Sequence, residues 1–224
     1  YHGGGLELMQ EIYAGHNIYS MPCQISAPEG SGWFRYEITS LGELKGLKMR
    51  FFGLGAKVME KLGVSTQLIA PGDIFPALEL GTIDAAELSF PALDLALGFY
   101  EVAKHYYFPG WHQPITFGEL MINLDDWNSI SSTQQAILQS VCKESITRTL
   151  AESEAIQFKA LQELEDKGVT LHRWNPEILA AFEAAWQEVV AEEAANDSDF
   201  SRVWDSLRTF RENYKVWGDL GYID

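Results

Sequence analysis

The longest uninterrupted helical pattern in the sequence covers residues 132–167, which contain neither proline nor glycine. Apolar side chains recur there four positions apart, for example Ile137 and Val141, a spacing that places them on one helical face. A helix of this length would extend roughly 54 Å, which exceeds the width of one small lobe. We therefore expect a single helix that runs through two lobes of the protein.

Upstream of this helix, strand-like and helix-like segments alternate. The order is strand 47–51, helix 54–63, strand 65–70, helix 71–81 and strand 85–88. This alternation predicts a parallel sheet with right-handed crossovers, and so an α/β fold. We expect Asp73 to cap the second of these helices. Ligands in such sheets bind beyond the carboxyl ends of the strands, where Arg50 and Glu87 fall.

The rest of the chain adds strands and C-terminal helices. Strands are expected at 117–123, where Glu119 is a single charge among apolar neighbours, and at 169–174. Helices are expected at 176–196 and 199–224. The last helix carries an apolar and aromatic face, formed by Phe200, Val203, Trp204, Leu207, Phe210, Tyr214 and Trp217. This face either packs on the protein's own core or forms a subunit interface, where exposed aromatic area concentrates.

The charge of the chain argues against several classes of partner. There are 32 acidic against 16 basic side chains, which gives a net charge of -16. Such a field repels phosphate backbones and anionic lipid, so we expect no nucleic-acid binding and no membrane docking. No run of about 18 apolar residues and no basic, apolar leader occurs, so we expect no membrane insertion and no signal peptide in this chain. A mature secreted protein would have lost such a leader.

Cysteine and histidine give no metal-site pattern. Cys23 and Cys142 are far apart and fit no metal-ligand spacing. We expect them to be buried free thiols, with a single disulfide as the alternative. The five histidines also lack such spacing, and we interpret His112 as structural.

Four motifs together carry a resemblance to a known family. They are GWFR at 32–35, GLKMR at 46–50, IDAAE at 83–87 and YYFPGWH at 106–112. In this order and spacing the sequence resembles the extracytoplasmic binding proteins, of the DctP type, that serve tripartite ATP-independent periplasmic (TRAP) transporters. It is most similar to the branch that binds 2-oxo acids, lactate and related monocarboxylates, and the resemblance covers nearly the whole chain.

The resemblance implies a two-lobe, periplasmic-binding-protein-like architecture with crossing strands and one long shared helix. It assigns the first lobe to 1–27 and 116–145, the second lobe to 28–115 and 146–183, and a helical tail to 184–224. The tail is expected to pair two copies into a homodimer. The family usually carries a further α/β unit ahead of the position of Tyr1, so we expect this chain to lack that unit.

The implied function is that of a periplasmic receptor without catalytic activity. It would bind a small monocarboxylate, such as pyruvate or a lactate-like acid, together with Na⁺ or Ca²⁺. Its lobes would close over both, and the acid would pass to the TRAP membrane subunits. Alternatives are a metal-dependent hydrolase that uses Glu29, Glu87 and Glu119, a sensor that binds the same ligand, and a remnant that binds nothing.

Arg50 is the first candidate for contact with the ligand. Its motif matches the family's ligand-carboxylate arginine, and a guanidinium offers two parallel donors that fit a carboxylate. Glu87 and the backbone carbonyl of Leu88 are expected to hold the cation, because hard cations prefer oxygen ligands. Leu88 stands where the family often has Trp, which removes an aromatic wall.

The remaining candidates are further ligands of the cation and apolar contacts of the acid. Glu29 stands where the family is expected to have Gln, and its extra negative charge would favour Ca²⁺ over Na⁺. Glu119 matches a family glutamate at the ion or ligand, and a charge in an apolar strand needs such a partner. Phe90 and Trp33 are candidates for contact with the carbon end of the acid, with core packing as the alternative.

Overall fold

The structure, a computed structural model, describes residues 2–222. These residues form two compact units. The first unit contains residues 2–24, 117–147 and 190–222, and the second contains 25–116 and 148–189. The chain passes between the units within β1 (Ile18–Ser26), β7 (Thr116–Asn123), α6 (Ser132–Asp166) and α7 (Pro176–Asn196). Residues 1, 223 and 224, which the predicted ranges include, lie outside the described residues.

The long helix predicted at 132–167 is present as α6, which ends one residue before the predicted bound. Its first part belongs to the first unit and its second part to the second unit. Gly168 follows with a φ of 80°, a left-handed conformation that ends the helix with little cost for glycine. None of the helices within residues 2–222 has the length and apolar character that crossing a bilayer requires.

The first unit is built on β1 and β7, which pair as a two-stranded sheet. Three further helices accompany it, α1 (Gly5–Ala14), α5 (Leu124–Ser129) and α8 (Ser198–Gly221). The core of the unit is small: Tyr19 stacks on Trp127 with ring centroids 3.9 Å apart, and Met21 lies beside them. Because so little apolar surface is buried, covalent support matters more in this unit than in the second.

That support is a disulfide between Cys23 in β1 and Cys142 in α6. The expectation of two free thiols is therefore wrong, and the alternative holds. The two positions are separated by 119 residues, and no local spacing could show that β1 packs on α6. A stable disulfide is typical of proteins that fold in an oxidising compartment.

The second unit contains a six-stranded sheet within the described residues, in the order β4-β3-β5-β2-β6-β8. The strand bounds are β2 Gly32–Phe34, β3 Lys48–Arg50, β4 Ser65–Gln67, β5 Ala85–Ala86, β6 His105–Phe108 and β8 Thr170–Arg173. Strand β3 pairs in parallel with β4 and β5, as predicted. Strand β2 was not predicted, and it runs antiparallel to β5 and β6 in the middle of the sheet.

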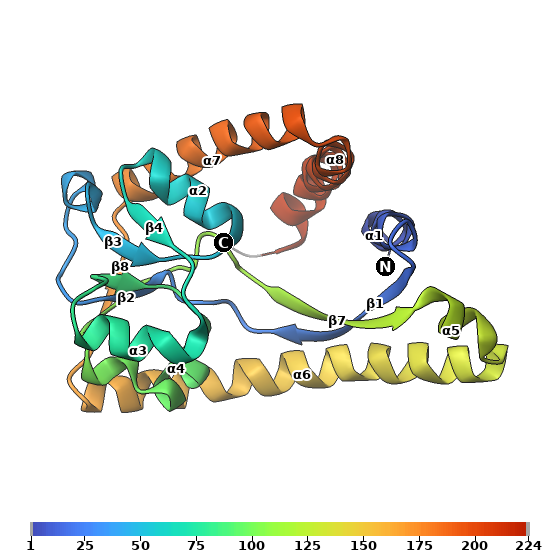
Figure 1. Ribbon diagram of the computed structural model, residues 1–224, viewed down its shortest axis with the longest axis horizontal. Coiled ribbons are helices and arrows are strands. Elements are labelled where there is room, and N and C mark those ends of the chain that lie inside the picture. Colours follow the sequence, from blue (N-terminus) through green and yellow to red (C-terminus); the bar gives the residue numbers. More distant parts are fainter. Residues whose placement is uncertain (1, 223–224) are drawn as a thin grey trace. The chain divides into compact units, whose positions relative to one another are not determined.

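Helices cover both faces of this sheet (Figure 1). On one face lie α2 (Gly53–Lys61) and α7, where Met49, Met59 and Phe182 meet in one core cluster. On the other lie α3 (Pro71–Glu79), α4 (Pro91–Leu97) and the end of α6, with Ile74 and Leu164 in a second cluster. Short 3-10 turns occur at Leu41–Leu44 and Phe99–Glu101.

The predicted cap at Asp73 is wrong. Helix α3 begins at Pro71, its cap position is Ala70, and no side chain caps it. Proline lacks an N–H and has a helical φ, so the first helical position suits Pro71. The helix therefore begins at Pro71, as the predicted range has it, but its cap position lies three residues before Asp73, which falls within the first turn.

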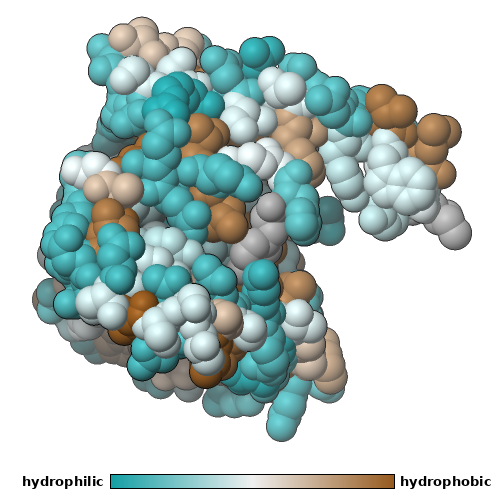
Figure 2. Space-filling view, turned by 90° about the vertical axis from the view of Figure 1, so that its right-hand side faces the viewer, coloured by the Kyte–Doolittle hydropathy of each residue, from teal (hydrophilic) through white to brown (hydrophobic). Residues whose placement is uncertain are grey.

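The apolar face of α8 is partly open to solvent. No residue of α8 is buried, and Trp217 and Leu220 are 59% and 81% exposed. Figure 2 shows apolar patches within a largely hydrophilic surface. Packing within the first unit thus covers this face only in part, since α1 contacts α8 and Phe200 and Trp204 are half-buried, and the subunit interface stays a prediction.

Candidate functional site

The second unit brings Arg50 and Glu87 together at the carboxyl ends of neighbouring strands. Arg50 is the last residue of β3 and pairs in register with Ala86 of β5, so Glu87 follows directly beside it. The Arg50 and Glu87 side chains are 7% and 4% exposed. Arg50 Nη1 donates to Glu87 Oε2 at 2.9 Å and also to the Glu87 carbonyl oxygen, while Nε donates to the carbonyl of Ile69 at 3.4 Å.

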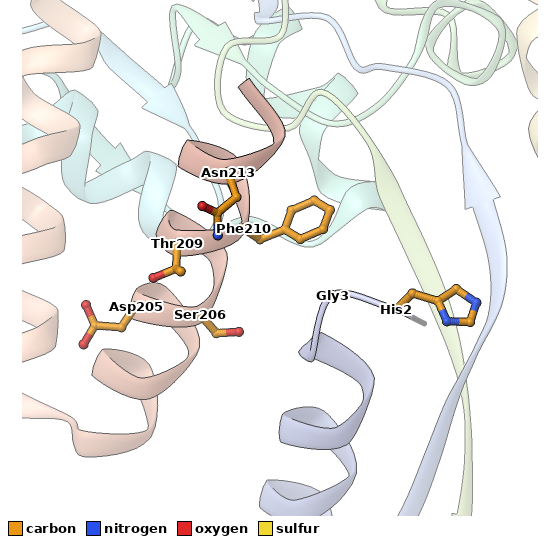
Figure 3. Close-up of a pocket in the computed structure, with 7 residues that line it drawn as sticks. All are labelled: His2, Gly3, Asp205, Ser206, Thr209, Phe210 and Asn213. Atoms are coloured by element: carbon orange, nitrogen blue, oxygen red, sulfur yellow. The ribbon is translucent and has the colours of Figure 1, made fainter. Parts of the chain in front are cut away.

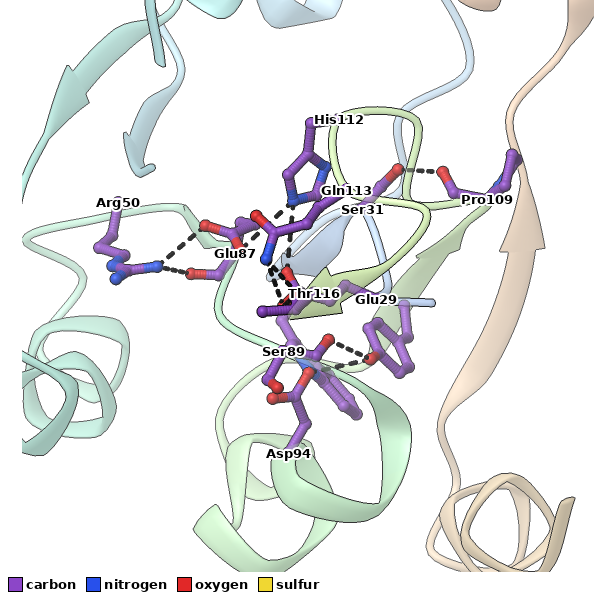
Figure 4. Close-up of polar contacts among 12 residues, drawn as sticks. Glu29, Ser31, Arg50, Glu87, Ser89, Asp94, Pro109, His112, Gln113 and Thr116 are labelled. Atoms are coloured by element: carbon purple, nitrogen blue, oxygen red, sulfur yellow. Dashed lines mark hydrogen bonds and ion pairs between the residues drawn. The ribbon is translucent and has the colours of Figure 1, made fainter. Parts of the chain in front are cut away.

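Glu29 joins this cluster from the irregular segment between β1 and β2. Its Oε1 accepts hydrogen bonds from Gln113 Nε2 at 2.9 Å and from Thr116 Oγ1 at 3.0 Å (Figure 4). Its Oε2 is buried and has no hydrogen-bond partner among the described residues. A buried carboxylate oxygen without a hydrogen bond is costly, and its charged neighbour, His112 at 3.6 Å, pairs with it only when protonated, which indicates that a ligand belongs there.

The loop at 109–113 approaches the Glu29 backbone closely. A Cβ at Gly110 would overlap the Glu29 carbonyl, so only glycine allows this approach. Two hydrogen bonds to backbone carbonyls fix the contact further, from the Glu29 backbone N–H to Gln113 O at 3.3 Å and from the Ser31 hydroxyl to Pro109 O at 2.5 Å. The GWHQ sequence is thereby held against the acid cluster.

His112 from this loop faces both glutamates. Its Nε2 lies 3.4 Å from Glu87 Oε1 and 3.6 Å from Glu29 Oε2. One ligand atom of each of these three residues lies within 4.8 Å of the others. Sequence reasoning assigned His112 a structural role, because its distance along the chain from Glu29 and Glu87 gives no metal-ligand spacing. Its place beside them depends on the tertiary fold.

The electrostatics of the cluster favour a cation. Burial alone would lower the pKa of His112, but the facing carboxylates of Glu29 and Glu87 outweigh it and raise that pKa above its usual value. The two carboxylates thus attract positive charge, either a proton on His112 or a cation, and with the imidazole neutral they leave a charge of -1 against the one Arg50 guanidinium. Carboxylate oxygens suit hard cations such as Ca²⁺. The donor set and the orphaned Glu29 Oε2 therefore fit a bound cation.

Asp94 lies behind the cluster, on α4. Its Oδ2 accepts from Trp33 Nε1 and Tyr106 Oη, both at 2.9 Å, and Oδ1 has no partner among the described residues. Burial raises the pKa of Asp94 to about 7, against the two hydrogen bonds, and the charges of Glu87 and Glu29 raise it further. Asp94 carried no signal in the sequence beyond being an acid near a helix start.

The other predicted residues fall in different places. Trp33 is fully buried and stacks on Tyr106 with centroids 4.1 Å apart, so it supports the site from the core. Leu88 and Phe90 are half-buried and follow Glu87 in the chain. Glu119 lies in the first unit and accepts from Tyr13 and Ser20 at 3.1 and 3.0 Å. Contact of Trp33, Leu88, Phe90 and Glu119 with a ligand stays a prediction.

A separate open pocket lies in the first unit, between the start of α1 and α8 (Figure 3). It is lined by His2, Gly3, Asp205, Ser206, Thr209, Phe210 and Asn213. None of these residues is among the predicted site residues, and none belongs to the acid cluster. The buried charges and the orphaned carboxylate, not this pocket, mark the candidate site.

Comparison with known proteins places this geometry in a family. Residues 30–197 match the family described as bacterial extracellular solute-binding protein, family 7. The chain belongs to this family. It consists of solute receptors and not enzymes, so the hydrolase alternative has no support. Over 223 residues the chain is 36% identical to a monocarboxylate 2-oxoacid-binding periplasmic protein of Nostoc sp.. The match takes in 100% of this chain but 61% of that relative, so the chain spans less than two thirds of the relative's length.

Solved TRAP solute-binding proteins share the fold. One from Bordetella bronchiseptica, a mixed-occupancy dimer with calcium and picolinate, has a TM-score of 0.93, 37% identity, and coverage of 98% of this chain and 66% of its own. One from Colwellia psychrerythraea, with calcium and pyruvate, has a TM-score of 0.92, 34% identity, and coverage of 98% and 67%. One from Pseudoalteromonas atlantica, with sodium and pyruvate, has a TM-score of 0.89, 33% identity, and coverage of 100% and 70%.

Proposed function

We propose that the chain is the solute receptor of a TRAP transporter and binds a small monocarboxylate, such as pyruvate or another 2-oxo acid, together with a cation. The observation that carries this proposal is the buried Arg50 beside an acid cluster that has an orphaned carboxylate oxygen. A group that can bind an anion, Arg50, and a cluster that can bind a cation thus lie side by side at the carboxyl ends of the strands. Similar proteins crystallised with pyruvate and calcium or sodium support it.

The positive and the negative groups of the site would bind different partners. Arg50 would hold the acid's carboxylate, because a guanidinium keeps its charge when buried and matches two carboxylate oxygens. Glu29 and Glu87 would hold the cation through carboxylate oxygens, with His112 beside them. When bound, the cation supplies positive charge that both glutamates and the acid's oxygens can share. The Leu88 backbone carbonyl is proposed as a further cation ligand, and Phe90 is proposed for contact with the carbon end of the acid.

Charge counting favours a divalent cation. With His112 neutral beside the bound cation, Glu29 and Glu87 against Arg50 leave -1, and a bound monocarboxylate takes the cluster to -2. Ca²⁺ would neutralise this charge, whereas Na⁺ would leave -1 in a site of low polarity, where residual charge is costly. We therefore propose Ca²⁺ in preference to Na⁺ for this chain.

The proposed setting is the periplasm, with TRAP membrane subunits as partners and a second copy of the chain as a further partner. The disulfide suits an oxidising compartment, and the exposed face of α8 suits pairing of two copies. One structural relative is described as a dimer. Analytical ultracentrifugation of Trp217→Ser against the unchanged chain would test the pairing, with a shift toward monomer expected.

Thermal unfolding tests the binding proposal. The chain is heated with pyruvate, 2-oxobutyrate, 4-methyl-2-oxovalerate or lactate, each in chelator, Na⁺ or Ca²⁺. At a ligand concentration of about 100 times the dissociation constant, binding should add ~2.7 kcal/mol of stability. Arg50→Lys serves as the matched variant, because it keeps the charge and loses the planar fork.

The expected result is a rise in melting temperature with a 2-oxo acid that needs the cation and is much reduced in Arg50→Lys. A chain that unfolds cooperatively but shows no rise with any acid in any ion would contradict the proposal. That outcome would favour the alternative of a remnant that binds none of these acids.

A further inference from the structure

Glu87 faces two different sets of charges with its two carboxylate oxygens. Oε2 forms the ion pair with Arg50 at 2.9 Å, and Oε1 faces His112 Nε2 at 3.4 Å, on the side of Glu29. The residue is 3% exposed, so water offers it little alternative solvation. One buried carboxylate therefore stands between the anion-binding and the cation-binding group of the site.

The ion pair leaves the Arg50 guanidinium only partly available. Nη1 donates to both the carboxylate and the carbonyl of Glu87, and Nε donates to the carbonyl of Ile69. Nη2 is the terminal nitrogen that has no hydrogen-bond partner within residues 2–222. A carboxylate binds a guanidinium best through two parallel N–H groups, and here one arm of that fork is already used.

Releasing Arg50 would leave Glu87 as a buried, unpaired anion. Breaking a buried ion pair in this way is strongly unfavourable, because the remaining charge is not solvated. Glu87 can give up Arg50 at low cost only if another positive charge takes its place. The side of Glu87 that faces Glu29, whose Oε2 is orphaned, is where such a charge would be held.

We infer that Glu87 is a latch on Arg50 that cation binding at Glu29 and Glu87 releases, so that the cation makes the arginine fully available to the acid. The inference rests on the proposed function and specifies its regulation. Acid and cation then bind with positive coupling, and the coupling is the same in both directions. A chain without the cation keeps its arginine paired internally and binds acid weakly.

Isothermal titration calorimetry on the full chain tests the latch. Pyruvate is titrated into the protein in chelator and in Ca²⁺, and Ca²⁺ is titrated with and without pyruvate. Two isosteric variants are compared, Glu87→Gln and Glu29→Gln. Each removes one negative charge from the cation site, but only Glu87→Gln also removes the anion that holds Arg50.

The latch predicts that Ca²⁺ raises pyruvate affinity of the unchanged chain by between about 5-fold and 150-fold, and that pyruvate raises Ca²⁺ affinity by the same factor. In chelator, Glu87→Gln should bind pyruvate more tightly than the unchanged chain, because Arg50 is no longer paired with a carboxylate. Glu29→Gln should show no such gain. Melting curves of both variants in chelator establish that they are folded.

Two results would overturn the inference. If folded Glu87→Gln binds pyruvate in chelator no better than the unchanged chain, while the latter binds in Ca²⁺, the latch is wrong and the receptor function stands. If neither the unchanged chain nor the variants bind pyruvate or the other acids under any condition, the proposed function fails and the latch fails with it.

Discussion

Removing the disulfide should cost the protein a large part of its stability. The bond between Cys23 and Cys142 closes a loop with a sequence separation of 119, which includes most of the second unit. In the chain-entropy account, closing a loop of that length removes about 16 cal/mol/K from the unfolded chain, or ~5 kcal/mol at 25 °C. This is an upper estimate, because residual structure in the unfolded chain reduces the gain.

The experiment compares Cys23→Ala, Cys142→Ala and the double variant with the oxidised chain. Urea unfolding in chelator gives the free energy between the native and the fully unfolded chain. If loop entropy dominates, all three variants should lose a similar amount, because each opens the same loop. Reduction of the unchanged chain by a thiol should give the same loss without any substitution.

The comparison between the single variants is the critical part. Cys142 is 2% exposed, whereas Cys23 is half-buried, so a loss of packing would make Cys142→Ala much worse than Cys23→Ala. A loss below about 1 kcal/mol in the double variant, or a large difference between the single variants, would refute the entropic reasoning. The disulfide lies in the first unit, so the pairing of Arg50 with Glu87 should not change.

Three further predictions concern the site. Glu29→Gln should lower Ca²⁺ affinity at least about tenfold and Na⁺ affinity by a smaller factor, because it removes one of the charges that favour a divalent ion. Calorimetry measures both affinities, and equal losses for the two ions would contradict the charge count. In the folded chain burial raises the pKa of Asp94 from its usual value near 4 to about 7, so the folded state holds this proton more tightly than the unfolded state does. The free energy of unfolding should therefore fall as pH rises from about 4 to 7. In chelator the stability of the unchanged chain relative to Asp94→Asn should fall by ~4 kcal/mol across that window in urea unfolding, and a difference that is constant with pH would refute this assignment. Gly110→Ala should cost about 1–3 kcal/mol through overlap with the Glu29 carbonyl, whereas Gly42→Ala, with no atom closer than 3.8 Å, should cost much less, and equal melting temperatures would contradict the close approach.

Local patterns in the sequence were enough to predict the parallel strands β3, β4 and β5, but not β6, which pairs in parallel with β8. Helix α6 follows from an unbroken helical periodicity, and β3, β4 and β5 follow from alternating strand and helix signals. Arg50 and Glu87 could be predicted to meet, because they end neighbouring parallel strands. Strand β2 could not, because three residues after a turn-rich segment carry no periodicity and gain their strand form from β5 and β6 on either side.

The parts that sequence reasoning missed depend on contacts between distant segments. His112 meets Glu29 and Glu87 because Gly110 lets its loop pass against the Glu29 backbone. The disulfide likewise depends on β1 packing on α6. Such contacts depend on the assembled fold, and no spacing between residues in the sequence indicates them.

Native mass spectrometry of the full chain can show whether acid and cation bind together, because it counts the bound partners. The chain is sprayed with pyruvate and Ca²⁺, with pyruvate and chelator, and as Arg50→Lys with both partners. The account predicts a complex of one chain copy with one Ca²⁺ and one pyruvate, little pyruvate in chelator, and a variant that keeps Ca²⁺ but loses most of its pyruvate. Pyruvate retained equally in all three samples, or in none, would contradict it.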